Sequence, residues 1–195
     1  VLNAMFSQIY GESPYKSPTD MGVNMAGNCI TDDEVCREAS RQEIIRRYYA
    51  AMCSARQGMS DSRPAEKIKL LINQLGITVK DRPVIGAAVE RAEHTGEPAA
   101  AIELPGGEII TGKTTKLLGA SAAALLNALK RLGGIQKDMH IISPIVIEPI
   151  QDLKVNHLGN HNPRLHMDEV LIALSICAAT NPTAEVAMRQ LGKLR

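Results

Sequence analysis

All Phe and Tyr residues of this 195-residue chain lie within its first 49 positions, and this distribution constrains its fold more than any other sequence feature. The rings are Phe6, Tyr10, Tyr15, Tyr48 and Tyr49, and there is no Trp. A chain of this length can bury a sizeable core. In the ring-free part, that core has to be built from Ile, Leu, Val, Ala and Met. The same part lacks the stacking surface on which single-stranded nucleic acids are usually bound.

The charge balance and the cysteines limit the partners and the compartment. Basic and acidic residues number 22 and 21, for a net charge of +1, so no broad basic field would attract nucleic acid. Apolar runs such as 170–179 are far shorter than the roughly 20 residues that span a bilayer. Cys29, Cys36, Cys53 and Cys177 form no C-x-x-C pair, which is typical of reduced proteins. We therefore expect a cytoplasmic protein whose partners include neither nucleic acid nor membrane.

Glycine and proline positions divide the chain into a helical subdomain, residues 1–78, and an α/β subdomain, residues 79–195. In the helical subdomain, a capping box at Thr31–Glu34 predicts a helix that runs to about residue 56. The polar Gln42 interrupts the apolar stripe of this helix, which consists of Val35, Ala39, Ile45, Tyr49 and Met52. A second helix should run from about residue 62 to residue 76.

The α/β subdomain should alternate helices and strands. We expect helices at 83–96, 120–132, 168–179 and 181–192, a hairpin of strands 98–104 and 108–111, and a third strand at 141–150. A polar loop, 156–167, should precede the helix at 168. The order α-β-β-α-β-α-α predicts an α/β fold class, with a small three-layer α/β subdomain next to a helical one.

Residues Gly107–Thr114 match the phosphate-loop pattern G-x-x-x-x-G-K-[ST] letter for letter. Two consecutive Ile residues inside the pattern, directly after a Pro-Gly-Gly turn, instead favour the return strand of a hairpin. We prefer the hairpin, and phosphate binding by the loop stays open as the alternative. In either case, Lys113 and Thr114 lie at the end of a strand, where they can contact an anion.

The segment 156–169 holds three of the five histidines and precedes a predicted helix start, where free amides and a partial positive charge suit an anion. Arg164 can grip a phosphate or carboxylate in bidentate fashion. His157 or His166 can act as general acid or base near neutral pH. The candidate ligand-binding residues of this segment are Asn156, Asn162 and Arg164, and its candidate catalytic residues are His157, His166 and Glu169.

Two other interpretations of this segment stay open. His157, His161, His166 and Asp168 are ligand types for a metal, although their spacing is no established zinc pattern, and we assign no metal. Alternatively, the Asn and His side chains only satisfy the loop backbone, and Asp168 is an ordinary helix cap. No motif identifies a cofactor, which stays unknown.

Several motifs resemble a bacterial family catalogued as domain of unknown function 1846. They are Ser17–Met25, Glu43–Tyr49, Leu104–Thr114, Asn156–Gly159 and Asn162–His166, and the resemblance runs over essentially the whole chain. Family members are much longer, which implies that this chain is a middle-to-late portion of such a protein. A Rossmann-like domain would then precede it.

The resemblance also implies a topology similar to that of cytidine deaminases for the α/β subdomain. It does not imply deaminase chemistry, which needs a His or Cys with Glu two residues on and a P-C-x-x-C motif to hold zinc, and Cys177 stands alone. In the family pattern, position 161 is variable, which weakens the metal interpretation further.

The same resemblance draws attention to the segment 17–24. Thr19 and Asp20 can cap a short helix. In the alternative, Asp20 and Asn24 lie one helical turn apart and point into a cleft shared with the 156–169 segment.

Two hypotheses for the function follow. In the first, the chain is part of an enzyme that binds an anionic, nucleotide-like small molecule in a cleft completed by the Rossmann-like domain. Arg164 and Lys113 would bind the anion, His166 would be the acid or base, and Asp20 or Glu169 would orient it. In the second, the chain is a non-catalytic scaffold that mediates self-association through the apolar, Met-containing surface of its helices.

Overall fold

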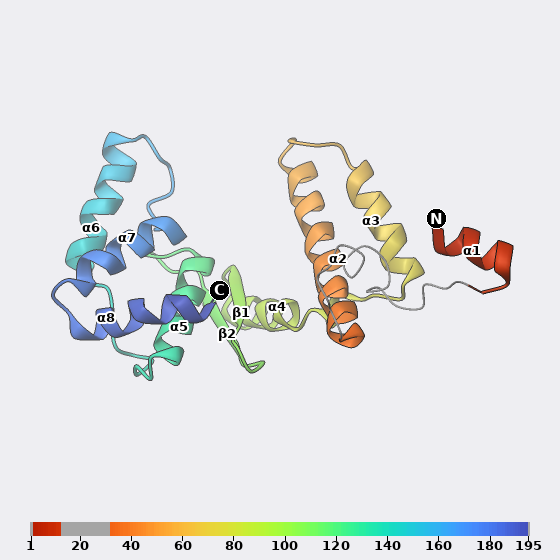
Figure 1. The fold of residues 1–195 in the computed structure, drawn as a ribbon. Coiled ribbons are helices and arrows are strands. Elements are labelled where there is room, and N and C mark those ends of the chain that lie inside the picture. Colours follow the sequence, from red (N-terminus) through yellow and green to blue (C-terminus); the bar gives the residue numbers. More distant parts are fainter. Residues whose placement is uncertain (1, 13–31, 195) are drawn as a thin grey trace. The chain divides into compact units, whose positions relative to one another are not determined.

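The computed structural model describes residues 2–12 and 32–194. Two compact units, residues 1–82 and 83–195, divide the chain and are described separately. The helical unit contains α1 (Leu2–Tyr10), α2 (Asp33–Arg56), α3 (Arg63–Gln74) and a short 3-10 turn, η1 (Val79–Asp81). Figure 1 shows α2 and α3 as neighbouring helices. The two predicted helices of this part of the chain are therefore confirmed.

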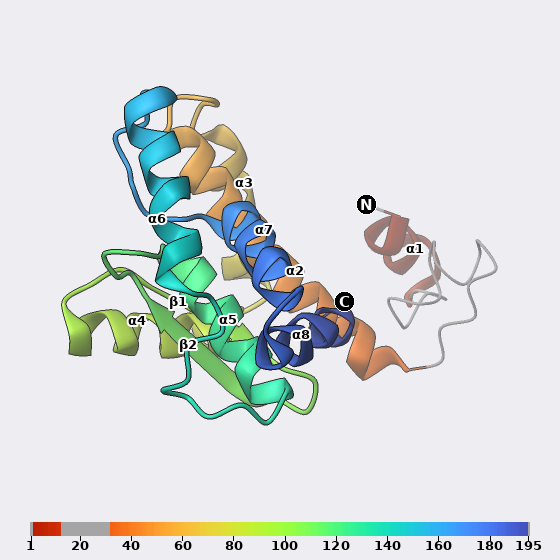
Figure 2. The ribbon, with the colours of Figure 1, turned by 90° about the vertical axis from the view of Figure 1, so that its left-hand side faces the viewer.

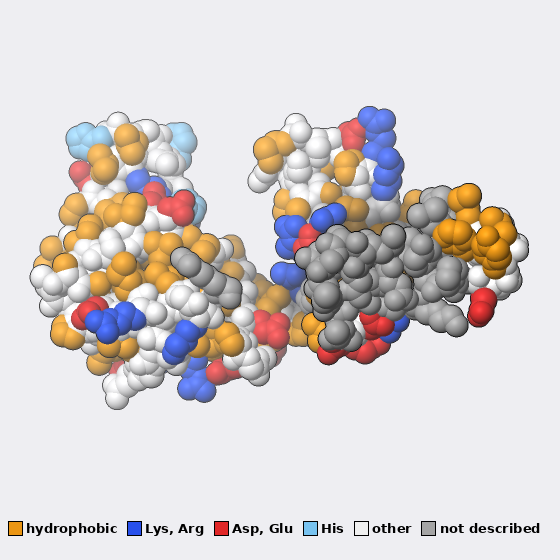
Figure 3. Space-filling model, in the orientation of Figure 1, with side chains coloured by type: hydrophobic (Ala, Val, Ile, Leu, Met, Phe, Trp, Pro, Cys, Tyr) orange, Lys and Arg blue, Asp and Glu red, His pale blue; other side chains and the backbone are white. Residues whose placement is uncertain are grey.

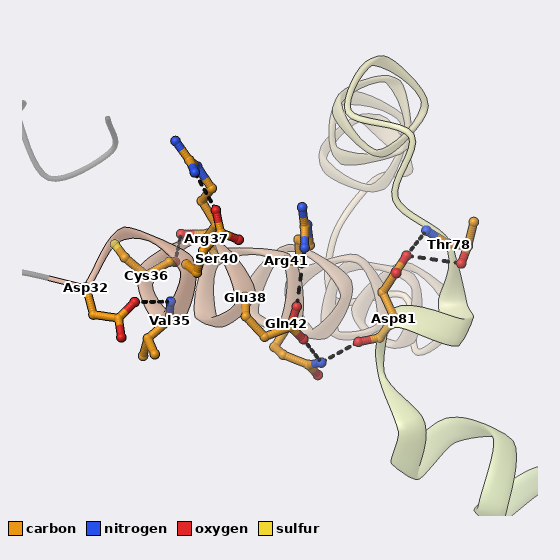
Figure 4. A network of polar contacts seen from close by, with 11 residues as sticks. Asp32, Val35, Cys36, Arg37, Glu38, Ser40, Arg41, Gln42, Thr78 and Asp81 are labelled. Atoms are coloured by element: carbon orange, nitrogen blue, oxygen red, sulfur yellow. Dashed lines mark hydrogen bonds and ion pairs between the residues drawn. The ribbon is translucent and has the colours of Figure 1, made fainter. Parts of the chain in front are cut away.

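The start of α2 differs by one residue from the predicted capping box. Asp32 is the N-cap, and its carboxylate accepts a 3.0 Å hydrogen bond from the Val35 amide (Figure 4). Thr31, the predicted cap, lies outside the described residues. A carboxylate at the N-cap satisfies a free amide as well as a hydroxyl does and also complements the helix dipole.

Gln42, which breaks the apolar stripe of α2, joins this helix to η1. Its side-chain amide donates to the Asp81 carbonyl (Figure 4). The Arg82 guanidinium donates to the Gln42 carbonyl over 3.2 Å. Asp81 in turn accepts a hydrogen bond from the Thr78 amide, which holds the pKa of its carboxyl below the ordinary value. The polar residue that interrupts the apolar stripe of α2 thus makes a specific tertiary contact.

The α/β unit begins with α4 (Pro83–Thr95), followed by an antiparallel hairpin of β1 (Ala99–Glu103) and β2 (Ile109–Lys113). Gly106 and Gly107 form its turn with φ of 102° and 85°, values that favour glycine. The hairpin prediction for Gly107–Thr114 is therefore confirmed.

Helices α4 and α5 (Ala120–Leu132) each contact both strands but not each other, so the hairpin lies between them (Figure 1). This arrangement is a small three-layer α/β unit. Gly112 makes the contact with α5 close, because a Cβ atom at this position would lie 2.1 Å from the Ala124 amide nitrogen. The cytidine-deaminase-like topology stays a prediction.

The elements that follow α5 in the chain complete the unit, and their helices build the aliphatic core together with α5 (Figure 2). They are α6 (Pro144–Asp152), a π-helical turn η2 (Leu153–His157), α7 (Met167–Ala178), α8 (Pro182–Arg189) and a 3-10 segment η3 (Gln190–Leu194). Leu129, Leu165 and Leu174 in this core are completely buried. As expected from the sequence, the core of this unit contains no aromatic ring.

The strand predicted at 141–150 is wrong, because the segment forms α6. Ser143 is the N-cap and Pro144 occupies the first turn, where a missing amide proton costs nothing. Short apolar runs rich in Ile and Val do not distinguish a strand from a buried helix by their periodicity. The loop prediction also needs correction, because Asn156 and His157 belong to η2 and the loop begins only after them.

Candidate functional site

The starts of α5 and α7 lie side by side, although they are far apart in the sequence. Leu118 and Leu165 pair as an isolated parallel β-bridge. The Gly119 amide donates to the Leu165 carbonyl over 3.0 Å, and the Leu165 amide donates to the Leu117 carbonyl over 2.9 Å. Because Gly119 and His166 are the N-caps of the two helices, the bridge brings both helix starts to one place.

A cavity of about 540 Å³ opens at these two helix starts, and we call it the helix-start cavity. Its lining consists of Pro98, Thr114, Gly119, Ala120, Ser121, Ala122, Asn162, Arg164, His166, Met167 and Asp168. The first amides of a helix have no partner inside the helix, and the helix dipole adds partial positive charge there. The structure therefore brings two helix starts to one cavity, where the sequence predicted only one.

Arg164 supplies a full positive charge to the helix-start cavity. Its Nε donates to the Thr115 carbonyl over 2.8 Å, and its backbone amide donates to the Asn162 side chain over 3.1 Å. These bonds hold the guanidinium group in place. Its two terminal nitrogens have no hydrogen-bond partner among the described residues and are free to bind a ligand.

His166 is the titratable side chain of the cavity best suited to proton transfer. Its Nε2 lies 3.4 Å from Nδ2 of Asn162, and its backbone amide donates to Glu169 over 2.7 Å. The amide of Asn162 therefore contacts one ring nitrogen. The side chain of His166 is exposed, so a ligand in the cavity can reach it.

Lys154, which was not predicted from the sequence, holds the loop before α7 to the first turn of that helix. The residue is 3% exposed, and its Nζ donates to the Arg164 carbonyl over 2.7 Å and to Glu169 Oε2 over 2.8 Å. A buried ammonium is costly unless it is paired. The only signal in the sequence is the position of this lysine between two apolar residues, Leu153 and Val155.

Glu169 pairs with Lys154 and caps the start of α7 by accepting a hydrogen bond from the His166 amide. It does not line the helix-start cavity. Partial burial raises its pKa, but the hydrogen bonds from Lys154 and the His166 amide outweigh burial, and the net pKa is lowered. The carboxylate thus orients the start of α7. Asp168 is the second residue of the helix and not its N-cap, which corrects that interpretation.

Asn156 and His157 are not brought to the cavity. Both contact Asp152, Asn156 through a 2.6 Å hydrogen bond and His157 at 3.7 Å, on the exposed end of α6. Figure 3 shows histidine side chains gathered over this end of the unit. Among residues 2–12 and 32–194, no group of three or more His, Cys, Asp or Glu side chains is placed to hold a metal ion.

Lys113 and Thr114 line two different cavities, because successive side chains of an extended chain point to opposite sides. Thr114 lines the helix-start cavity, whereas Lys113 lines a different one. The three candidates of the first segment, Thr19, Asp20 and Asn24, lie outside the described residues.

The fold and the cavity define a class: a helical unit followed by an α/β unit in which two helix starts, an arginine and a histidine form one polar cavity. Comparison with known proteins then assigns the family. The models "Domain of unknown function DUF1846, N-terminal" and "C-terminal" match residues 1–76 and 80–195. The chain belongs to the DUF1846 family.

Curated relatives cover the whole chain at high identity. A UPF0371 protein of Corynebacterium urealyticum is 55% identical over 194 residues, and one of Streptococcus thermophilus is 55% identical over 195. A UPF0371 protein of Streptococcus pneumoniae is 54% identical over 195 residues. The chain spans 39–40% of the length of these relatives. None of the described helices has both the length and the apolar character needed to cross a membrane.

Proposed function

We propose that the chain forms part of a cytoplasmic enzyme that binds the anionic group of a small, nucleotide-like molecule in the helix-start cavity. The observation that carries this proposal is the pairing of Leu118 with Leu165, which gathers two helix starts and Arg164 around one cavity. A phosphate is the group that such a set of amides and a guanidinium binds best.

Each side chain has a distinct role in this proposal. Arg164 binds the anion through its terminal nitrogens, and the hydroxyls of Thr114 and Ser121 add hydrogen bonds. His166 transfers a proton, and Asn162 holds its ring. The Rossmann-like domain that the family resemblance implies would complete the cleft and bind the rest of the ligand.

Thermal unfolding of the complete natural protein with a panel of nucleotides and sugar phosphates tests this function. A ligand that binds the native state raises the midpoint by mass action. We expect Arg164→Gln to weaken the binding of the stabilising ligand about tenfold, the loss of roughly one charge-assisted hydrogen bond. Arg189→Gln removes an arginine paired with Glu185 on the surface of α8 and serves as the matched control. Equal affinity in the two variants would refute the proposal.

A scaffold function is the second candidate, and it is favoured by exposed apolar side chains on the helical unit. Met59, Leu70 and Leu75 are 71%, 63% and 56% exposed. Such a surface is suited to self-association. Sedimentation of the complete protein distinguishes this candidate, since a monomer at high concentration argues against it.

A further inference from the structure

A second cavity, of about 610 Å³, lies on the other side of the segment 114–118, and we call it the basic cavity. It is formed by α4, the end of β2, one side of α5 and the segment 140–147. The helix-start cavity and the basic cavity have no lining residue in common. All the elements that line the basic cavity belong to the α/β unit.

Four cationic side chains line the basic cavity: Arg91, Lys113, Lys116 and Lys130. No Asp or Glu is among its lining residues. In the described part of the chain, none of the four forms an ion pair within 4.0 Å, although most surface arginines of the helical unit do. A concentration of unpaired positive charge around one hollow favours a bound anion.

Arg91 gives the strongest indication of an absent partner. Its Nε is buried and has no hydrogen-bond partner in the structure. Buried donors are nearly always satisfied, so an orphaned guanidinium nitrogen calls for a specific explanation. Arg91 itself lines the basic cavity, so an anion bound there would pair with the charge of its guanidinium group.

The ammonium group of Lys130 is also affected by its position in the cavity wall. Burial lowers the pKa of its ammonium group, and the charge of Asp138 only partly opposes this effect. Its Nζ donates to the Lys137 carbonyl over 3.0 Å, which leaves further donor capacity for a ligand. An anion next to this lysine would favour its charged form.

Besides the four cations, the lining has three polar residues, Thr115, Asn127 and His140, and the rest of it is apolar. Leu126, Ile141 and Ile147 are at most 7% exposed and form part of the wall, together with Leu117, Leu118, Ala123 and Ile142. Residues 50–195 contain no Phe, Tyr or Trp, so the imidazole of His140 is the only aromatic ring among the lining residues on which a nucleobase could stack. The wall fits a hydrocarbon group better than a base.

From this combination of charge, an orphaned donor and an aliphatic wall, we propose that the basic cavity binds a phosphorylated small molecule with a hydrocarbon body. The phosphate contacts Arg91 and Lys113, with Lys116 and Lys130 nearby, and the hydrocarbon part lies against Leu126 and Ile147. Arginine and lysine together suit a phosphate, which offers several acceptor oxygens. This binding does not depend on the function proposed for the helix-start cavity.

Isothermal titration calorimetry of the complete natural protein tests the proposal with hexyl phosphate, inorganic phosphate and hexanol as probes. Hexyl phosphate carries both features, and each of the other two carries one. We expect hexyl phosphate to bind at least about tenfold more tightly than inorganic phosphate, because several methylene groups become buried. Equal affinity for these two probes would overturn the proposal.

Four variants locate the binding. Lys113→Gln and Arg91→Gln should each weaken hexyl phosphate about tenfold. Lys67→Gln removes a charge on α3 that lines neither cavity and should leave the affinity unchanged. Arg164→Gln should weaken only phosphate binding at the helix-start cavity and should leave the preference of the basic cavity for hexyl phosphate over inorganic phosphate in place.

The proposal is refuted if hexyl phosphate binds Lys113→Gln as tightly as the unmodified protein, or if Arg164→Gln alone abolishes its binding. Circular dichroism checks that each variant is folded. Should Arg91→Gln disturb the packing of α4, Lys113→Gln alone decides, because its side chain lies at the end of a strand and is only half-buried.

Discussion

Replacement of Lys154 by methionine tests how the helix-start cavity is supported. Methionine keeps an unbranched stem of similar length but removes the ammonium group that donates to the Arg164 carbonyl and to Glu169. The start of α7 and the loop before it would then lose their side-chain link to η2, while the backbone hydrogen bond from Asn160 to the Lys154 carbonyl would remain. We expect Lys154→Met to destabilise the fold and to weaken anion binding at the cavity.

The magnitude follows from burial. Breaking a buried ion pair by removing one partner typically costs about 3–5 kcal/mol. Here the Glu169 side chain is 28% exposed, so water can solvate its carboxylate, and methionine keeps the apolar contacts of the stem. We therefore expect a loss of about 2–3 kcal/mol, below the usual range for a fully buried pair. For a chain of this size, that loss lowers the unfolding midpoint by roughly 4–12 °C.

Urea unfolding of the 195-residue chain at pH 7, followed by far-ultraviolet circular dichroism, measures this loss. Glu169→Gln and the double variant complete a double-mutant cycle, in which we expect a coupling of at least about 1 kcal/mol. Lys67→Met, at an exposed position of α3, is the matched control and should change stability by less than about 0.5 kcal/mol. A Lys154→Met variant as stable as this control, with unchanged anion affinity, would contradict the role assigned to Lys154.

Two further predictions concern the acid stability of the α/β unit and its closest helix–strand contact. Because the folded-state pKa of Glu169 is lowered, its stabilising contribution is present above the ordinary pKa of about 4.3 and is lost as the pH falls through the lowered value. The stability difference between the unmodified chain and Lys154→Met should therefore shrink between about pH 5 and pH 3 in urea titrations, and a constant difference would disagree. Gly112→Ala places a Cβ 2.1 Å from the Ala124 amide nitrogen and should cost about 3 kcal/mol or more in thermal unfolding, whereas Gly107→Ala, which meets no atom, should cost only about 1–2 kcal/mol for its positive φ. Equal losses in the two glycine variants would argue against the close approach of β2 to α5.

Local signals predicted most elements of the α/β unit. The Pro-Gly-Gly turn and the β-branched residues after it identified the hairpin, and glycines marked the ends of α4 and α5. The phosphate-loop pattern misleads, because the second glycine, Gly112, serves close packing between a strand and a helix. The failure at α6 has a different cause. A short amphipathic helix with one buried face and a strand can both appear in the sequence as a short apolar run, and tertiary packing decides between them.

Half of the candidate site could be found from the sequence, and the other half could not. Arg164, His166 and Asn162 stood out because chemically active residue types crowd one short segment. The contribution of α5 depends on the pairing of Leu118 with Leu165, two ordinary leucines whose contact no local pattern encodes. Lys154 was missed for a similar reason, since a single lysine gives no sign of burial until its partners are known.

The placement of all rings within the first 49 residues makes the α/β unit optically silent. Tyrosine fluorescence and near-ultraviolet circular dichroism of this chain report on residues 1–82 alone, so unfolding of the helical unit can be followed without a contribution from the rest. Far-ultraviolet signals report on both units together, and the difference between the two methods isolates the α/β unit. A single tryptophan introduced at the rim of the basic cavity, for example at Leu117, would give this unit its own fluorophore on a background free of other tryptophans.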